Sequence, residues 1–180
     1  PKKLQILILE KIWLLAVLLK KNSRMKRIIK KILFIGLIIF LLMQLYQPAR
    51  NISFEQDITG NFTKVYNVPK NVEIILRTSC YDCHSNNTYY PWYSYIQPAR
   101  FFMERHIKEG KEELNFNEFG NYSKRRQNSK LKAISKEIES NEMPLSSYTL
   151  IHKNAILTAS QKKEVLDWIN KTKDSISLQN

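Results

Sequence analysis

The sequence predicts an all-α protein, in which a small domain of about four helices with long loops follows an N-terminal transmembrane anchor. Three observations lead to this prediction. Apolar residues recur at helical spacing within residues 68–175, and no segment shows the apolar–polar alternation of a β-strand. A basic stretch is followed by an apolar run over residues 32–46.

Each expected helix has a start signal. Pro69 and Pro98 suit the first turn of a helix, where proline loses no backbone hydrogen bond. Ser123 can cap a third helix, and Thr158 with Gln161 has the spacing of a capping box before the fourth. The expected helices cover about residues 70–80, 98–114, 124–141 and 158–172.

The positive charge of the chain is concentrated at its N-terminus. Of 29 Lys and Arg, ten lie in residues 1–31, which contain one acidic residue. Because basic residues before an apolar run stay in the cytoplasm, we expect residues 32–46 to be an uncleaved signal anchor, or alternatively a cleaved signal peptide. We interpret Met25 as the native start and residues 1–24 as extra upstream sequence.

The remaining divisions follow from composition. We expect a linker at 47–67, the helical domain at 68–175 and a tail at 176–180. The chain has 4 Gly and neither a G-x-G-x-x-G motif nor a P-loop, which argues against nucleotide binding. Outside the N-terminal segment the charge is nearly balanced and no nucleic-acid motif occurs, so no nucleic-acid partner is expected.

The two cysteines of the chain form the motif that carries chemistry. Cys80-Tyr81-Asp82-Cys83-His84 is C-x-x-C-H, the attachment motif of c-type haem. Two thiols on one turn can reach the two vinyl groups of a porphyrin, and the adjacent His84 can then ligate the iron. The sequence therefore predicts one covalently attached haem c held by Cys80, Cys83 and His84.

Three other interpretations of these cysteines stay open. A disulfide redox motif needs a βαβ context, which is not predicted here. A zinc site needs two further ligands, and the remaining histidines, His106 and His152, lack zinc-finger spacing. A structural disulfide is compatible with export but gives no reason for His84.

Residues 68–168 resemble the bacterial haem-binding domain family of membrane-anchored mono-haem c-type cytochromes. The resemblance rests on C-Y-D-C-H-S-N at 80–86, P-W-Y-S-Y-I at 91–96, L-N-F at 114–116, E-M-P at 142–144 and the segment 152–157. It implies a cytochrome c-like fold, and a haem domain that faces the periplasm from a single-pass anchor in the bacterial inner membrane. Leu145 departs from the family, in which a second proline often follows the Met-Pro pair.

An electron-transfer haem usually keeps a second protein ligand. Met143 is the expected ligand, because it follows the last turn of a helix and Pro144 would stiffen its backbone. Other possibilities are His152, His106 and an open site, and Met103 is a further residue of suitable type. For Met143 the ordinary alternative is a methionine that fills a gap in the core.

Two further groups of residues have both a functional and an ordinary interpretation. Aromatic residues after the motif could wall the haem or simply pack in the core: Tyr89, Tyr90, Trp92, Tyr93 and Tyr95. A basic run could dock an acidic redox partner, although a solvated helix face is the more common case: Lys124, Arg125, Arg126, Lys130 and Lys132. Trp168 is expected in the core between the terminal helices.

The sequence thus predicts a c-type cytochrome that transfers electrons outside the cytoplasmic membrane. Its expected partners are extracytoplasmic redox proteins, and it is not expected to be an enzyme. The alternative is a haem-based sensor or peroxidase-like protein with an exchangeable distal ligand. A haem-free interaction module with a disulfide belongs to a third class.

Overall fold

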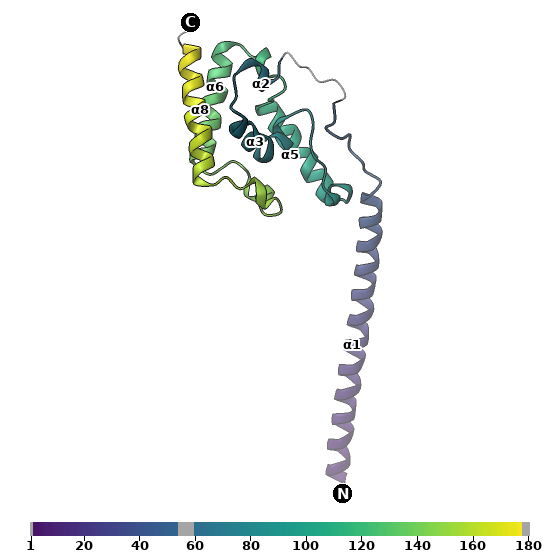
Figure 1. The fold of residues 1–180 in the computed structure, drawn as a ribbon. Helices are drawn as coiled ribbons and strands as arrows, with labels where there is room; N and C mark the ends of the chain where they lie inside the picture. Colours follow the sequence, from purple (N-terminus) through teal and green to yellow (C-terminus); the bar gives the residue numbers. More distant parts are fainter. Residues whose placement is uncertain (1, 54–59, 178–180) are drawn as a thin grey trace. The chain divides into compact units, whose positions relative to one another are not determined.

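The computed structural model describes residues 2–53 and 60–177, with side chains described at 10–13, 23–53 and 60–176. It divides into two compact units, Pro1–Gln47 and Pro48–Asn180. Throughout the described ranges the regular structure is helical, without a strand, and an isolated β-bridge joins Ile52 to Asn87. The predicted all-α class is therefore confirmed (Figure 1).

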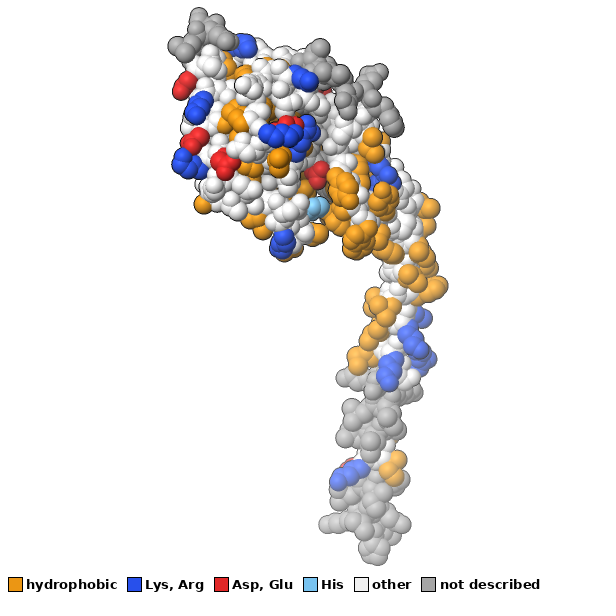
Figure 2. Space-filling view, viewed as in Figure 1, with side chains coloured by type: hydrophobic (Ala, Val, Ile, Leu, Met, Phe, Trp, Pro, Cys, Tyr) orange, Lys and Arg blue, Asp and Glu red, His pale blue; other side chains and the backbone are white. Residues whose placement is uncertain are grey.

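The N-terminal unit is a long helix, α1 (Lys2–Met43). In this helix a cluster of Lys and Arg at residues 24–31 is followed by hydrophobic side chains, which are exposed from Ile32 to Met43 (Figure 2). Among the helices that the structure describes, none has the length and apolar content needed to cross a membrane. The anchor expected over residues 32–46 stays a prediction.

Four longer helices of the C-terminal unit occupy the predicted segments: α3 (Lys70–Ser79), α5 (Ala99–Glu113), α6 (Lys124–Glu139) and α8 (Ala159–Ser177). The predicted caps are formed. The backbone N–H of Arg126 donates to Ser123 Oγ at 3.4 Å. Thr158 and Gln161 form a reciprocal capping box, with N–H to side-chain oxygen distances of 2.9 and 3.2 Å.

Shorter elements connect these helices: α2 (Phe62–Val65), α4 (Tyr81–His84), η1 (Trp92–Tyr95), η2 (Phe119–Asn121), α7 (Ser146–Thr149) and η3 (Lys153–Ala155). Of these, α4 contains Cys83 and His84, and α7 begins three residues after Met143. The C-terminal unit therefore positions its functional residues on short turns that are supported by longer helices.

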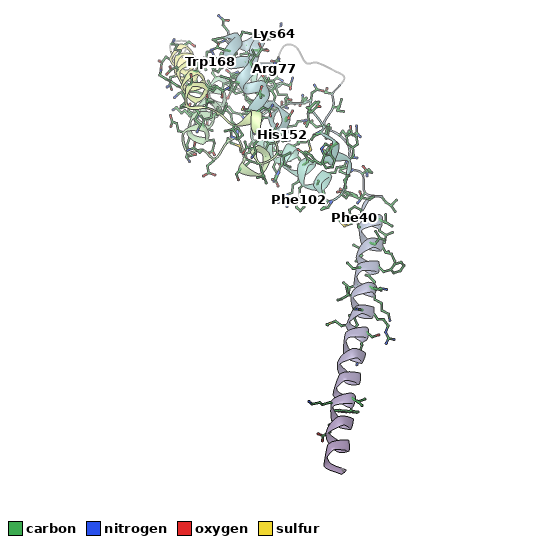
Figure 3. All side chains as sticks on the ribbon, turned by 60° about the horizontal axis from the view of Figure 1, so that its bottom comes forward. Phe40, Lys64, Arg77, Phe102, His152 and Trp168 are labelled. Carbon is green, nitrogen blue, oxygen red and sulfur yellow. The ribbon has the colours of Figure 1, made fainter. Side chains whose placement is uncertain are left out.

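The core lies between α3, α6 and α8. Leu76, Leu131 and Val165 come from these three helices and are buried together with Trp168, as expected. Some apolar residues of the predicted helices instead face solvent, among them Ile74 and Phe102. In Figure 3, Trp168 on α8 and Phe102 on α5 lie on well-separated parts of this unit.

The structure differs from the expected linker at 47–67, because parts of that segment belong to the folded unit. Phe62 of α2 is fully buried and packs edge-on against Phe116, Phe119 and Trp168, with ring centroids 4.8–5.3 Å apart. At the other end of the chain, Ile176 is buried, so the folded unit includes the first residue of the expected tail. Residues 54–59 and 178–180 lie outside the described residues.

Candidate functional site

The C-x-x-C-H motif forms a tight turn directly after α3. The backbone N–H groups of Cys83 and His84 both donate to the carbonyl of Cys80, at 3.2 and 3.0 Å. Tyr81 is buried and stacks on Phe116 with ring centroids 4.7 Å apart, which fixes the turn to the core. The turn therefore presents the two cysteines and the histidine together.

These residues line an apolar cavity made of two adjoining pockets of about 320 and 340 Å³. Both pockets are lined by Ser79, Cys80, His84, Glu113, Met143 and Pro144. Cys83, Asp82 and Tyr148 line the first pocket, whereas Phe116, Ile134 and Ile138 line the second. The structure thus brings all four predicted site residues, Cys80, Cys83, His84 and Met143, to one cavity.

The imidazole of His84 is held through one nitrogen. Its Nδ1 lies 2.8 Å from the carbonyl oxygen of Gly110 and 3.1 Å from that of Leu114. Because a carbonyl oxygen can only accept, Nδ1 carries the proton and Nε2 keeps its lone pair. Burial also lowers the pKa of His84, which favours this neutral form. The residue is therefore prepared to ligate a metal through Nε2.

The two cysteines are free thiols in the structure. Burial, and next the neighbouring Cys83, raise the pKa of Cys80 to about 12. Burial, and next Asp82, raise the pKa of Cys83 to about 11. Thiol–disulfide chemistry uses low-pKa, accessible thiolates, so these surroundings do not favour a disulfide redox motif.

Helix α5 approaches the motif closely at Gly110. A Cβ atom added to Gly110 would lie 2.9 Å from the carbonyl oxygen of Cys83 and 3.3 Å from its Cβ. The residue at this position must therefore be small. The same residue supplies the nearer carbonyl acceptor for His84, so α5 both supports the turn and orients the imidazole.

Met143 lies in an irregular segment between α6 and α7. The left-handed conformation of Asn141, with φ 61°, ends α6 and turns the chain. The backbone N–H of Met143 then donates to the carbonyl of Glu137 at 3.2 Å, and the Met143–Pro144 peptide bond is cis. Met143 is half-buried and lines both pockets.

The donor set and the cavity fit a haem. Two thiols, an unprotonated imidazole nitrogen and a thioether meet in an apolar space, whereas the described residues contain no group of three His, Cys, Asp or Glu that could hold a bare metal ion. The model of a family described as a haem-binding domain matches residues 38–171. The chain belongs to the haem-binding domain family. This confirms the family expected from the sequence.

No curated protein and no solved structure gives a significant match to this haem-binding domain protein. What can be said of its individual residues therefore rests on their geometry in this chain.

The other residues considered as haem ligands are placed differently from Met143. His106 is exposed on α5 and lines only the first pocket. His152 and Met103 line neither pocket. The Nε2 atom of His152 lies 2.5 Å from the hydroxyl of Tyr93 and is therefore already in a hydrogen bond.

Tyr148 and Asp82 take part in the site although the sequence did not single them out. The hydroxyl of Tyr148 donates to Asp82 Oδ2 at 2.7 Å, and its ring stacks on His152 with centroids 4.2 Å apart. Burial and the adjacent Asp82 raise the pKa of Tyr148, so its hydroxyl remains a donor. The two partners are 66 positions apart, and no periodic pattern connects them.

The five aromatic residues for which the sequence allowed either a place against the haem or packing in the core line neither pocket. Tyr89 and Trp92 are 74% and 77% exposed, whereas Tyr93 contacts the site indirectly through His152. Within the basic run, Lys130 lines the second pocket, and its Nζ lies 3.5 Å from Glu113 Oε2. Its neighbours in the run face solvent: Lys124, Arg125, Arg126 and Lys132.

Proposed function

We propose that this haem-binding domain is a c-type cytochrome that holds one covalent haem and transfers electrons. In this proposal Cys80 and Cys83 form the two thioethers, His84 is the proximal ligand and Met143 is the distal ligand. The observation that supports it is the convergence of these four residues on one apolar cavity, with His84 Nε2 left unprotonated.

Attachment needs no oxidant. Cys80 and Cys83 would hold the haem by adding their S–H groups across its two vinyl groups, with the sulfur on one vinyl carbon and the hydrogen on the other. When bound, the haem supplies an iron that can change its oxidation state by one electron. The carbonyls of Gly110 and Leu114 hold the His84 ring in orientation, and apolar side chains such as Phe116 and Ile134 line the second pocket beside it.

We further propose that the domain works outside the cytoplasmic membrane, where it exchanges electrons with extracytoplasmic redox proteins and is not itself an enzyme. The basic residues before Ile32 and the apolar run after them favour export.

Both a thioether ligand and an apolar surrounding favour the ferrous form of a haem, so they raise its reduction potential.

The test is the optical spectrum of the full chain expressed with haem-attachment machinery, recorded in the ferric and ferrous states. We expect a c-type spectrum whose haem stays with the protein after denaturation, together with the weak far-red ferric band of a methionine–iron bond. Met143→Ala should abolish that band while the haem stays attached. Met103→Ala is the matched control, because Met103 lies outside the cavity, and it should keep the band.

The alternative function is a haem-based sensor or peroxidase-like protein with an exchangeable distal ligand. Two observations favour it: Met143 lies in an irregular segment rather than within a helix, and the exposed His106 lines the same first pocket. A high-spin ferric spectrum with rapid binding of carbon monoxide or peroxide to the wild-type protein would place this alternative first.

A further inference from the structure

The segment that carries Met143 is held to α6 by the bond from the Met143 N–H to the Glu137 carbonyl, and its contacts with the C-x-x-C-H turn lie further along the chain. Residues 143–152 include α7 and the turn after it, which is closed by backbone bonds such as that from the His152 N–H to the Tyr148 carbonyl at 3.0 Å. Because these bonds are local, they do not fix the segment against the C-x-x-C-H turn. Other contacts must do so.

Two side-chain contacts connect the segment to other elements, the first to the C-x-x-C-H turn and the second to η1. The hydroxyl of Tyr148 donates to Asp82, which lies between the two cysteines, at 2.7 Å. The hydroxyl of Tyr93 in η1 bonds to Nε2 of His152 at 2.5 Å. The rings of Tyr148 and His152 stack nearly parallel, with a 10° interplanar angle, so the two contacts support one another. We call these four residues, Asp82, Tyr93, Tyr148 and His152, the Tyr148 network.

The Tyr148 network is well placed to resist movement of the Met143 segment. Asp82 is itself held by the loop that follows the motif. The backbone N–H of Tyr89 donates to Asp82 Oδ1 at 3.1 Å, and Thr88 Oγ1 donates to the backbone carbonyl of Asp82 at 2.6 Å. Tyr148 is half-buried and lines the first pocket, where a hydrogen bond to a carboxylate is stronger than in water.

We propose that Tyr148 and His152 are positioning residues, which hold the residue 143–152 segment against Asp82 and Tyr93 and thereby keep Met143 on the haem iron. This inference rests on the proposed ligation by Met143. His152 then acts through its bond to Tyr93 rather than as a ligand. An external ligand reaches the iron only when Met143 has left it, so its apparent affinity reports the fraction of protein in which the segment has moved.

The experiment is a titration of the ferric, haem-loaded full chain with imidazole. Tyr148→Phe removes the hydroxyl that bonds to Asp82 and keeps the ring that stacks on His152. We expect imidazole to bind about five- to tenfold more tightly to this variant than to the wild type, because a hydrogen bond to a charged acceptor is lost. Tyr93→Phe removes the second contact and should shift the affinity in the same direction.

The matched control is Tyr66→Phe. The hydroxyl of Tyr66 donates to Gln127 at 2.6 Å, and neither residue lines the cavity. This variant also loses a part-buried tyrosine hydrogen bond, so it should unfold at lower urea concentration with imidazole affinity unchanged. Equal affinity in wild type, Tyr148→Phe and Tyr66→Phe would overturn the inference, as would an equal increase in both variants.

A second readout uses the protein before haem attachment. In hydrogen exchange, the amides of residues 148–152 should exchange faster in Tyr148→Phe than in Tyr66→Phe, and equal exchange would count against the inference. The ligand assignment is tested separately. A wild-type spectrum without the band of the methionine–iron bond would refute ligation by Met143, and with it this inference, before any variant is compared.

Discussion

The imidazole of His84 can carry its proton on either nitrogen, and two backbone carbonyls decide which one. The carbonyls of Gly110 and Leu114 decide between them, since both can only accept a hydrogen bond from Nδ1. The tautomer depends on residues 26 and 30 positions away, which no local pattern predicts.

The residues of the site differ in how clearly the sequence indicates their roles. Cys80, Cys83 and His84 could be proposed from the sequence because the spacing of the motif is itself the chemical requirement. Met143 was suggested by its place after a helix and beside Pro144. Tyr148 gave no such signal, because its role depends on Asp82, a partner from a distant part of the chain.

Glu73 provides a prediction that depends on pH. Hydrogen bonds from Arg77 at 2.7 Å and Lys70 at 3.1 Å lower its pKa below the ordinary 4.5. A lowered folded-state pKa stabilises the protein above the unfolded-state pKa, and this contribution is lost as the pH falls through the folded-state value. We expect Glu73→Gln to lower the free energy of unfolding by about 0.5 kcal/mol at neutral pH.

The measurement is urea unfolding of both proteins at pH 7 and at a series of values below 4.5. The difference between wild type and Glu73→Gln should shrink as the pH falls, because the wild-type carboxylate becomes protonated. A difference that stays constant over this range would show that the ion pairs are not its source. Glu112→Gln is a suitable control, since its carboxylate lies 4.0 Å from Lys108 in an exposed pair.

At the scale of helices, the sequence was most informative where the signals are local. Ser123 and the Thr158–Gln161 pair predicted the starts of α6 and α8, because a cap is formed by residues within one turn of each other. It was harder to predict which apolar helix faces are buried. Phe102 has the spacing of an apolar helix face but is 55% exposed, since whether a face is covered depends on which elements pack against it.

Gly110 is where the packing of two helices bears directly on the site. Replacing it with alanine would place a Cβ 2.9 Å from the carbonyl oxygen of Cys83, so α4 and α5 would have to separate. We expect Gly110→Ala to lower the free energy of unfolding by about 1–3 kcal/mol, despite the higher helix propensity of alanine. It should also lower the fraction of chains that carry haem, because the motif and the acceptor of His84 move together.

Gly36→Ala is the control, since an added Cβ at that position in α1 meets nothing within 4 Å. Both variants should be compared by urea unfolding and by the ratio of haem absorbance to protein absorbance. If Gly110→Ala loads haem as fully as Gly36→Ala, the close approach of α5 is not required for the site.

At the scale of the whole chain, the folded unit begins earlier than its helical pattern suggests. Asn51 connects the early segment to the loop after the haem motif: its Nδ2 donates to Ser85 O at 2.8 Å and to Thr88 Oγ1 at 2.9 Å. Lys111 of α5 donates to Asn51 Oδ1 at 2.7 Å. These are polar contacts between distant residues, so the segment has the composition of a linker although part of it is packed.

Phe62 is the clearest case of a residue in the expected linker that belongs to the folded unit, and it leads to a prediction about the domain boundary. Scattered aromatic residues in a polar stretch show no periodicity, yet Phe62 is fully buried among Phe116, Phe119 and Trp168, which come from two other parts of the chain. We expect Phe62→Ala to lower the free energy of unfolding of the C-terminal unit by about 3–5 kcal/mol, because it opens a cavity in this cluster. Phe102→Ala makes the same chemical change on the surface and should cost less than about 1 kcal/mol. The comparison needs urea unfolding of both full-length variants, followed by circular dichroism. Equal midpoints would mean that residues 60–67 are a linker after all, and a large difference would place the start of the folded unit before α3.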